Sequence, residues 1–177
     1  MPSAHLADLV HEAPSLPRAA LRIGIDLVHV GAVERSLSDF GARFSDRLFA
    51  PGELRDSTVA GRLDARRLAL RFAAKEATIK AFDLGAIGLG WSQIEVIADA
   101  PAAGRVRLHG RAAAAAAGAG SYEIAVSWSH DGDVACAIVV AVPAADAGTA
   151  GGAPAGASRD ELRYGVGAAD IYNEEQN

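Results

Sequence analysis

The chain has 177 residues, of which 50% are hydrophobic and 22% charged, and its formal net charge at pH 7 is −5. This length accommodates one domain with a full core, and the acidic balance argues against a nucleic-acid partner. No apolar run is long enough to span a bilayer, and charged residues interrupt the first 20 residues, so we expect neither a membrane span nor a cleaved signal peptide. A single cysteine, Cys136, excludes an internal disulfide and indicates a reducing compartment, which we take to be the cytoplasm.

Charge and composition divide the chain into three parts. Residues 143–177 hold six acidic and two basic residues in an Ala- and Gly-rich context, which predicts a disordered acidic tail. Residues 1–20 show no hydrophobic period and are interpreted as a flexible arm, which leaves the domain to residues 21–142. Residues 21–82 carry eleven basic and eight acidic residues, net +3, which suits a phosphorylated ligand or an acidic protein partner.

Residues 21–30 predict a β-strand, because β-branched residues alternate along them. Leu21, Ile23, Ile25 and Leu27 would share one face, and Asp26 would share the other with Gly24. Asp is a poor strand former, so its presence requires a reason. It is either a strand-end residue that faces water or a metal ligand, with Gly24 leaving room beside it.

Two amphipathic helices are predicted next. The first covers residues 32–50 and ends at Pro51-Gly52. The second begins after Asp64, a plausible N-cap, and ends near Phe82. Glu76 falls on its apolar stripe, where a carboxylate is costly to desolvate without a cation. That cation is either Lys80, one turn along, or a metal ion that takes a second oxygen ligand from elsewhere.

The remaining segments predict mainly strands. The glycine-rich loop at 84–90 follows a helix instead of preceding one, so helix termination explains it better than phosphate binding. Strands are expected at 92–98, 105–109, 122–128 and 134–142, the last buried on both faces, and an alanine-rich helix lies between the second and third. Asp131-Gly132 predicts a tight hairpin that presents Ser129, His130 and Asp131. Taken alone, these turn residues are either solvated or functional.

Four segments in a fixed order resemble the holo-acyl-carrier-protein synthases, the short bacterial type of 4′-phosphopantetheinyl transferase. They are Gly24-Ile-Asp-Leu-Val28, Phe49-Ala-Pro-Gly-Glu53, Arg71-Phe-Ala-Ala-Lys-Glu-Ala-Thr-Ile-Lys-Ala-Phe82 and Val126-Ser-Trp-Ser-His-Asp131. The resemblance covers about residues 21–142. It implies an α+β fold, with an antiparallel sheet packed against a long central helix, and a homotrimer whose sites lie between subunits.

The resemblance also implies a reaction. The phosphopantetheine arm of coenzyme A would pass to a serine of an apo acyl carrier protein of fatty-acid or polyketide synthesis, with release of 3′,5′-adenosine diphosphate. Asp26 and Glu76 would hold Mg²⁺, Lys80 would meet phosphate, and Glu76 would take the serine proton. Asp131 would orient His130 or assist proton transfer. The coenzyme A contacts implied are Arg71, Lys75, Lys80, Gly85, Ser129 and His130.

Two departures from the family pattern keep other functions open. His29 and Ala32 stand where the family often has Glu and Arg, and Asp83-Leu84 stand where it usually has Gly-Thr. The alternatives are a non-catalytic module that binds carrier proteins, or a different Mg²⁺-dependent phosphoryl or nucleotidyl transferase that uses the same carboxylates.

Overall fold

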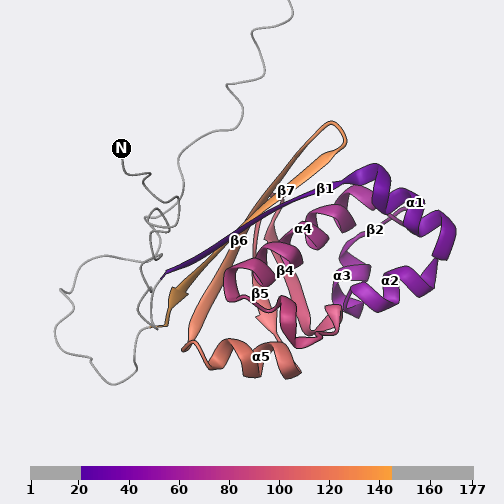
Figure 1. The fold of residues 1–177 in the computed structure, drawn as a ribbon. Helices are drawn as coiled ribbons and strands as arrows, with labels where there is room; N and C mark the ends of the chain where they lie inside the picture. The colour runs from indigo at the N-terminus through magenta and orange to yellow at the C-terminus, as the bar shows by residue number, and fades with distance from the viewer. Residues whose placement is uncertain (1–20, 145–177) are drawn as a thin grey trace, which may run out of the picture. The chain divides into compact units, whose positions relative to one another are not determined.

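The computed structural model describes residues 21–144, which form one antiparallel sheet with helices against it (Figure 1). The expected arm and nearly all of the expected tail lie outside these residues. The sheet has the strand order β1-β7-β6-β5-β4. Its strands are β1 (Arg22–His29), β4 (Ile94–Ala100), β5 (Ala103–Leu108), β6 (Tyr122–Asp131) and β7 (Val134–Pro143). A separate small hairpin pairs β2 (Thr58–Val59) with β3 (Arg62–Leu63).

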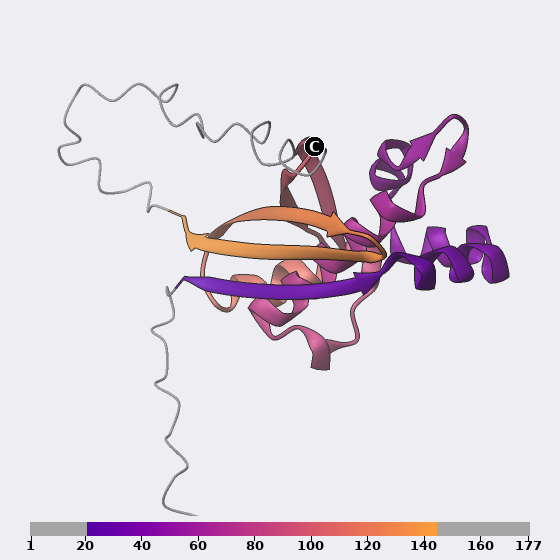
Figure 2. The same ribbon diagram turned by 90° about the horizontal axis from the view of Figure 1, so that it is seen from above.

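The segment expected to form one helix over 32–50 forms two. They are α1 (Val30–Phe40) and α2 (Ala42–Leu48), and Gly41 breaks them apart with a φ of 53°. A short α3 (Pro51–Asp56) follows, and Figure 2 shows α1 and α2 continuing beyond the end of β1. The alanine-rich segment forms α5 (Gly110–Ala117), and the glycine-rich region contains two 3₁₀ turns, η2 (Gly85–Ile87) and η3 (Trp91–Gln93). No helix among the residues described is long and apolar enough to cross a membrane.

The central helix α4 (Ala65–Phe82) has the predicted limits. The Asp64 Oδ1 atom accepts a hydrogen bond from the Arg67 backbone N–H at 2.9 Å, which is an N-cap. At the other end Asp83 takes the left-handed conformation that closes the helix. The face of α4 that packs against the sheet consists largely of alanines, namely Ala73, Ala74, Ala77 and Ala81. Small side chains bring this helix close to β1 and β7.

Gly24 marks the closest approach of β1 to α4. A Cβ added at Gly24 would lie 1.9 Å from the Ala77 carbonyl oxygen, which is far inside van der Waals contact. The sequence indicates a small residue here to leave room, and the structure shows that the helix backbone takes that room.

The other face of the sheet is apolar and open in the single chain. Ile23, Ile25 and Leu27 on β1 are 60%, 51% and 64% exposed, and Ile138 on β7 is 42% exposed. The prediction that residues 134–142 are buried on both faces is therefore wrong for one chain. Alternate residues of β7 pack under α4, and those between them face outward.

Candidate functional site

The inward face of β1 and one flank of α4 bring Asp26, Glu76 and Lys80 together. The Lys80 Nζ atom donates to Asp26 Oδ1 at 2.6 Å and to the Ile25 carbonyl oxygen at 3.2 Å. The Asp26 side chain is 15% exposed, whereas that of Lys80 is 54% exposed. Lys80 thus pairs across to the strand instead of forming the Glu76–Lys80 pair that helical spacing allowed.

The electrostatics of this cluster favour a further cation. Desolvation and the charge of Asp26 raise the pKa of Glu76, while Lys80 acts in the opposite direction. The hydrogen bond that Lys80 donates to Asp26 raises the pKa of Lys80, which stays charged at neutral pH. Two carboxylates therefore lie near one ammonium group, which is hydrogen-bonded to Asp26.

The donor set of the cluster fits Mg²⁺. Mg²⁺ takes one or two protein carboxylates and completes its shell with phosphate oxygens and water. No group of three or more metal-binding side chains occurs within residues 21–144, so an all-protein cage is absent there. Asp26 and Glu76 provide the two hard oxygen ligands that such a shared shell needs.

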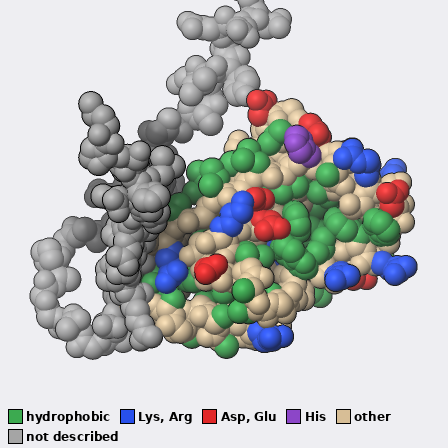
Figure 3. All heavy atoms as spheres, viewed as in Figure 1, with side chains coloured by type: hydrophobic (Ala, Val, Ile, Leu, Met, Phe, Trp, Pro, Cys, Tyr) green, Lys and Arg blue, Asp and Glu red, His purple; other side chains and the backbone are tan. Residues whose placement is uncertain are grey.

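A cavity of about 320 Å³ adjoins Glu76 on the side of the glycine-rich loop. Gly85 lies in its wall with Leu84, and the Trp91 ring closes it beside Phe72, at 5.1 Å between ring centroids. The predicted ligand contact at Gly85 is thus placed next to the carboxylate cluster. Figure 3 shows acidic and basic side chains side by side on the face over α4.

Arg71 and His130 line a different and larger cavity, of about 560 Å³. Arg71 is 5% exposed; its Nη2 atom lies 3.7 Å from Asp56 Oδ2, and Nη1 donates to the Arg67 carbonyl oxygen. Burial lowers the pKa of Arg71, and its Nε–H has no partner among the described residues. Arg66 and Arg67 also lie in the wall, together with Asp56, Asp64 and Asp99, so side chains of both charges line this cavity.

One chain does not unite these two places. Glu76 follows Arg71 by five residues, which is about 140° around a helix, so they occupy different flanks of α4. In the sheet, β7 separates Asp26 on β1 from His130 on β6. Residues that the sequence assigned to one site therefore lie in two separate places in one chain.

The hairpin that carries Ser129, His130 and Asp131 differs from the prediction in its turn. Asp131 pairs with Val134, so Gly132 and Asp133 form the turn, and Gly132 has a φ of 51°. Ser129 and Asp131 line a cavity of about 310 Å³ that also includes His130. Among residues 21–144 no hydrogen bond joins Asp131 to His130, so the expected orienting contact is not formed.

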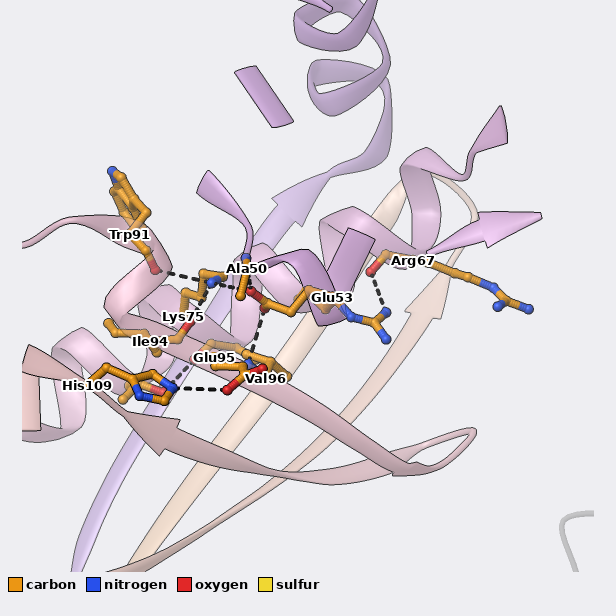
Figure 4. A network of polar contacts seen from close by, with 12 residues as sticks. Ala50, Glu53, Arg67, Lys75, Trp91, Ile94, Glu95, Val96 and His109 are labelled. Carbon is orange, nitrogen blue, oxygen red and sulfur yellow. Dashed lines mark hydrogen bonds and ion pairs between the residues drawn. The ribbon is translucent and has the colours of Figure 1, made fainter. Parts of the chain in front are cut away.

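Lys75, expected as a coenzyme A contact, lies in the interior of the chain. Its side chain is fully buried, and Nζ donates to Glu53 Oε2 at 2.7 Å, to the Trp91 carbonyl oxygen at 3.1 Å, and to that of Ile94 (Figure 4). These partners satisfy all three donors of an ammonium group. Lys75 lines neither cavity and joins α4 to α3 and to the start of β4.

Sequence reasoning missed the importance of Glu53. Its carboxylate also accepts from the Ala50 N–H at 2.7 Å and from the Val96 N–H at 3.2 Å. Burial raises the pKa of Glu53 and lowers that of Lys75, and their mutual attraction opposes both shifts. Ala50 precedes the helix that Pro51 begins, and Glu53 follows Ala50 by three residues, which is half of a capping box. This spacing was the signal available in the sequence.

A groove of about 520 Å³ lies on α1 and α2. Phe40, Arg43, Phe44 and Arg47 line it, and Phe40 is 60% exposed. Figure 3 shows basic side chains around this end of the molecule, with hydrophobic ones between them. Arginine beside exposed phenylalanine suits an acidic partner that also has apolar side chains.

Comparison with known proteins places this geometry in a family. The family model for the 4′-phosphopantetheinyl transferase superfamily, ACPS, matches residues 22–139. A holo-[acyl-carrier-protein] synthase of Gloeobacter violaceus is 38% identical over 118 residues, which cover 67% of this chain and 89% of that protein. The corresponding protein of Geobacter metallireducens is 41% identical over 119 residues, with 66% and 93% covered.

Solved structures agree. The Chronobacterium ammoniagenes ACPS-CoA complex superposes with a TM-score of 0.60 at 33% identity, covering 71% of this chain and 99% of that one. The Helicobacter pylori holo-[acyl-carrier-protein] synthase in complex with coenzyme A gives 0.56 at 28% identity, covering 67% and 98%. The chain belongs to the 4′-phosphopantetheinyl transferase superfamily, within the family of holo-acyl-carrier-protein synthases.

Proposed function

We propose that this chain transfers the 4′-phosphopantetheine arm of coenzyme A to a serine of an apo acyl carrier protein in a Mg²⁺-dependent reaction. The observation that carries the proposal is the cluster of Asp26, Glu76 and Lys80, where two carboxylates lie near one ammonium group. Family membership gives the reaction, and this cluster supplies the chemistry that it needs. The free Cys136 fits a reducing compartment, and we retain the cytoplasm as the proposed location.

The three residues of the cluster divide metal binding, phosphate binding and proton transfer among them. Asp26 and Glu76 bind the metal, which when present neutralises charge on the coenzyme A diphosphate. Lys80 exchanges its contact with Asp26 for a phosphate oxygen and stabilises the charge that develops there. Glu76, directly or through a water, takes the proton from the serine hydroxyl, whose oxygen forms the new bond to phosphorus. The bond from that phosphorus to the bridging oxygen breaks, and 3′,5′-adenosine diphosphate leaves.

The complete site lies between subunits. Arg71 and His130 line the cavity of about 560 Å³, yet they lie away from Asp26 and Glu76 in the same chain. We propose that these two places meet across an interface in a homotrimer and form one site there. The neighbouring subunit would then supply part of the coenzyme A pocket, which includes Ser129 of the β6–β7 hairpin. The open apolar face of β1 and β7 supports this assembly, because a patch of this kind marks a protein interface.

The groove on α1 and α2 is the proposed docking place of the carrier protein. Arg43 and Arg47 would meet acidic side chains of the carrier, and Phe40 would fill an apolar contact. Arg35, also exposed on α1, stands near the position where Ala32 departs from the family pattern. Because Ala32 stands where the family often has Arg, an experiment must identify the carrier protein that docks here.

One assay tests the proposal. The chain is incubated with coenzyme A, Mg²⁺ and a panel of apo carrier proteins from fatty-acid and polyketide synthesis, and the carrier mass is measured. We expect a mass gain of one phosphopantetheine on at least one carrier, and a loss of about 10² or more in rate for Glu76→Gln. Tight carrier binding without a mass gain would favour the non-catalytic module. Failure of coenzyme A to bind would favour a different phosphoryl transferase.

A further inference from the structure

The end of the β6–β7 hairpin reaches beyond β4 and β5 (Figure 1). The pairing of β6 with β5 stops at Ser127, whereas its pairing with β7 continues to Asp131. The segment that carries Ser129, His130 and Asp131 therefore has a strand neighbour on one side only. On its other side β7 pairs with β1 as far as His29 with Val134, so β6 is the outer strand of a three-stranded end.

Asp133 in the hairpin turn adds a contact between this end and the start of α1. Its carbonyl oxygen accepts from the Val30 N–H at 2.8 Å, and its Oδ1 atom accepts from the Gly31 N–H at 2.8 Å. Both donors belong to the first turn of α1. The fit is close, because a Cβ added at Gly31 would lie 3.3 Å from Asp133 Oδ1.

Helix α1 needs a cap from outside its own sequence. Its N-cap residue, His29, makes no capping hydrogen bond, and the first turn holds no acidic residue. A carboxylate near a helix N-terminus satisfies free N–H groups and is favoured by the helix dipole. Asp133 supplies this carboxylate from a position 102 residues later in the chain.

The other contact of Asp133 is weak. His29 Nδ1 lies 3.5 Å from Asp133 Oδ2, but the two side chains are 72% and 62% exposed. Exposed pairs of this kind contribute little. The hydrogen bonds to the α1 backbone, and not the ion pair, hold the turn.

We propose that Asp133 is a positioning residue that fixes the His130 end of the hairpin to the first turn of α1. Within the proposed function, on which this inference rests, the hairpin end contacts coenzyme A and α1 belongs to the carrier-docking surface. Asp133 would thus fix the position of the coenzyme A contact relative to the carrier-docking surface. It touches neither substrate.

The test compares Asp133→Ala with Asp133→Asn. The Ala variant loses the capping oxygen, whereas the Asn variant keeps Oδ1 and loses only the charge. We expect Asp133→Ala to raise the KM for coenzyme A about tenfold, the scale of one lost cap, with kcat changed less than about twofold. Asp133→Asn should restore the KM to near the wild-type value, and His29→Ala should leave it unchanged.

Amide hydrogen exchange provides an independent readout. We expect the Gly31 and Val30 amides to lose protection in Asp133→Ala and to keep it in Asp133→Asn. Thr58→Ala, which removes an exposed 2.8 Å hydrogen bond to the Leu54 carbonyl oxygen, is the control for a small general destabilisation.

Two results would overturn the proposal: unchanged protection at Gly31 in Asp133→Ala, or lost protection with an unchanged KM for coenzyme A. A wild-type chain that transfers nothing would instead count against the proposed function. The exchange measurement would still decide whether Asp133 holds the hairpin.

Discussion

Glu76 carries the sharpest electrostatic consequence at the scale of single residues. Its pKa is raised in the folded chain by desolvation and by Asp26, so the folded state holds this proton more tightly than the unfolded state does. The contribution of Glu76 to stability is therefore most favourable below its ordinary pKa of 4.5 and declines as the pH rises through the raised value.

Replacing Glu76 with Gln removes this decline. In the absence of divalent cations we expect Glu76→Gln to be at least as stable as the wild type at neutral pH. The difference in Tm should shrink as the pH falls below about 4.5. Thermal unfolding across this pH range measures it, with the exposed Glu34→Gln on α1 as the control. A Gln variant clearly less stable than the wild type at neutral pH would show that Glu76 is already neutralised by a protein group.

The buried pair of Lys75 and Glu53 makes a prediction of another kind. Lys75→Met leaves the Glu53 carboxylate buried without its cation, so we expect a loss of about 3–5 kcal/mol in the free energy of unfolding. Exposed Arg43→Met should lose less than about 0.5 kcal/mol in the same denaturant titration. The double variant Glu53→Gln, Lys75→Met should recover part of the loss and keep the KM for coenzyme A. A large rise in that KM with recovered stability would restore Lys75 as a ligand contact.

At the scale of elements, the sequence was most informative where the pattern was local. The central helix follows its N-cap Asp64 and ends at Phe82, as predicted. The alternation along β1 places Asp26 on the inward face with Gly24, also as predicted. The break at Gly41 was missed, because the apolar spacing continues across it and the positive φ leaves no mark in that spacing. Which way Lys75 points was also beyond sequence reasoning, since the answer depends on α3 and β4 packing against the same flank of α4.

Gly24 sets the spacing between the two elements that carry the carboxylates. A Cβ there would lie 1.9 Å from the Ala77 carbonyl oxygen. This atom belongs to the backbone of α4, which cannot change rotamer to relieve the clash as a side chain can. We expect Gly24→Ala to destabilise the fold by about 1–3 kcal/mol or more and to weaken Mg²⁺ binding by moving Asp26 from Glu76.

Denaturant unfolding and calorimetric Mg²⁺ titration measure the two effects. Gly90→Ala is the matched control, because the nearest atoms to its added Cβ lie at 3.8 Å and its φ is not positive. If Gly24→Ala bound Mg²⁺ as the wild type does, the spacing of β1 and α4 would not govern the site.

At the scale of the whole molecule, the proposed site requires its two parts to come from different subunits. The apolar face that includes Ile25 and Leu27 is open in one chain, so we expect Ile25→Asp to shift the assembly toward monomers in sedimentation. The same variant should lose transfer activity although its Asp26 and Glu76 are unchanged. A monomeric and fully active variant would contradict a shared site.

Mixing inactive variants tests the sharing itself. Glu76→Gln and Arg71→Ala are each expected to be inactive alone, because one damages the metal half and the other the half that contains Arg71. After unfolding and refolding together in equal amounts, each interface has about one chance in four of uniting two intact halves, so about a quarter of wild-type activity should return. No recovery in verified mixed assemblies would place both halves in one chain.

The most direct test of the central claim is a calorimetric titration of Mg²⁺ into the protein with coenzyme A present. The wild type should bind one Mg²⁺ per subunit. Asp26→Asn and Glu76→Gln should each weaken binding by at least about tenfold. Unchanged Mg²⁺ affinity in both variants would show that Asp26 and Glu76 do not hold one ion between them.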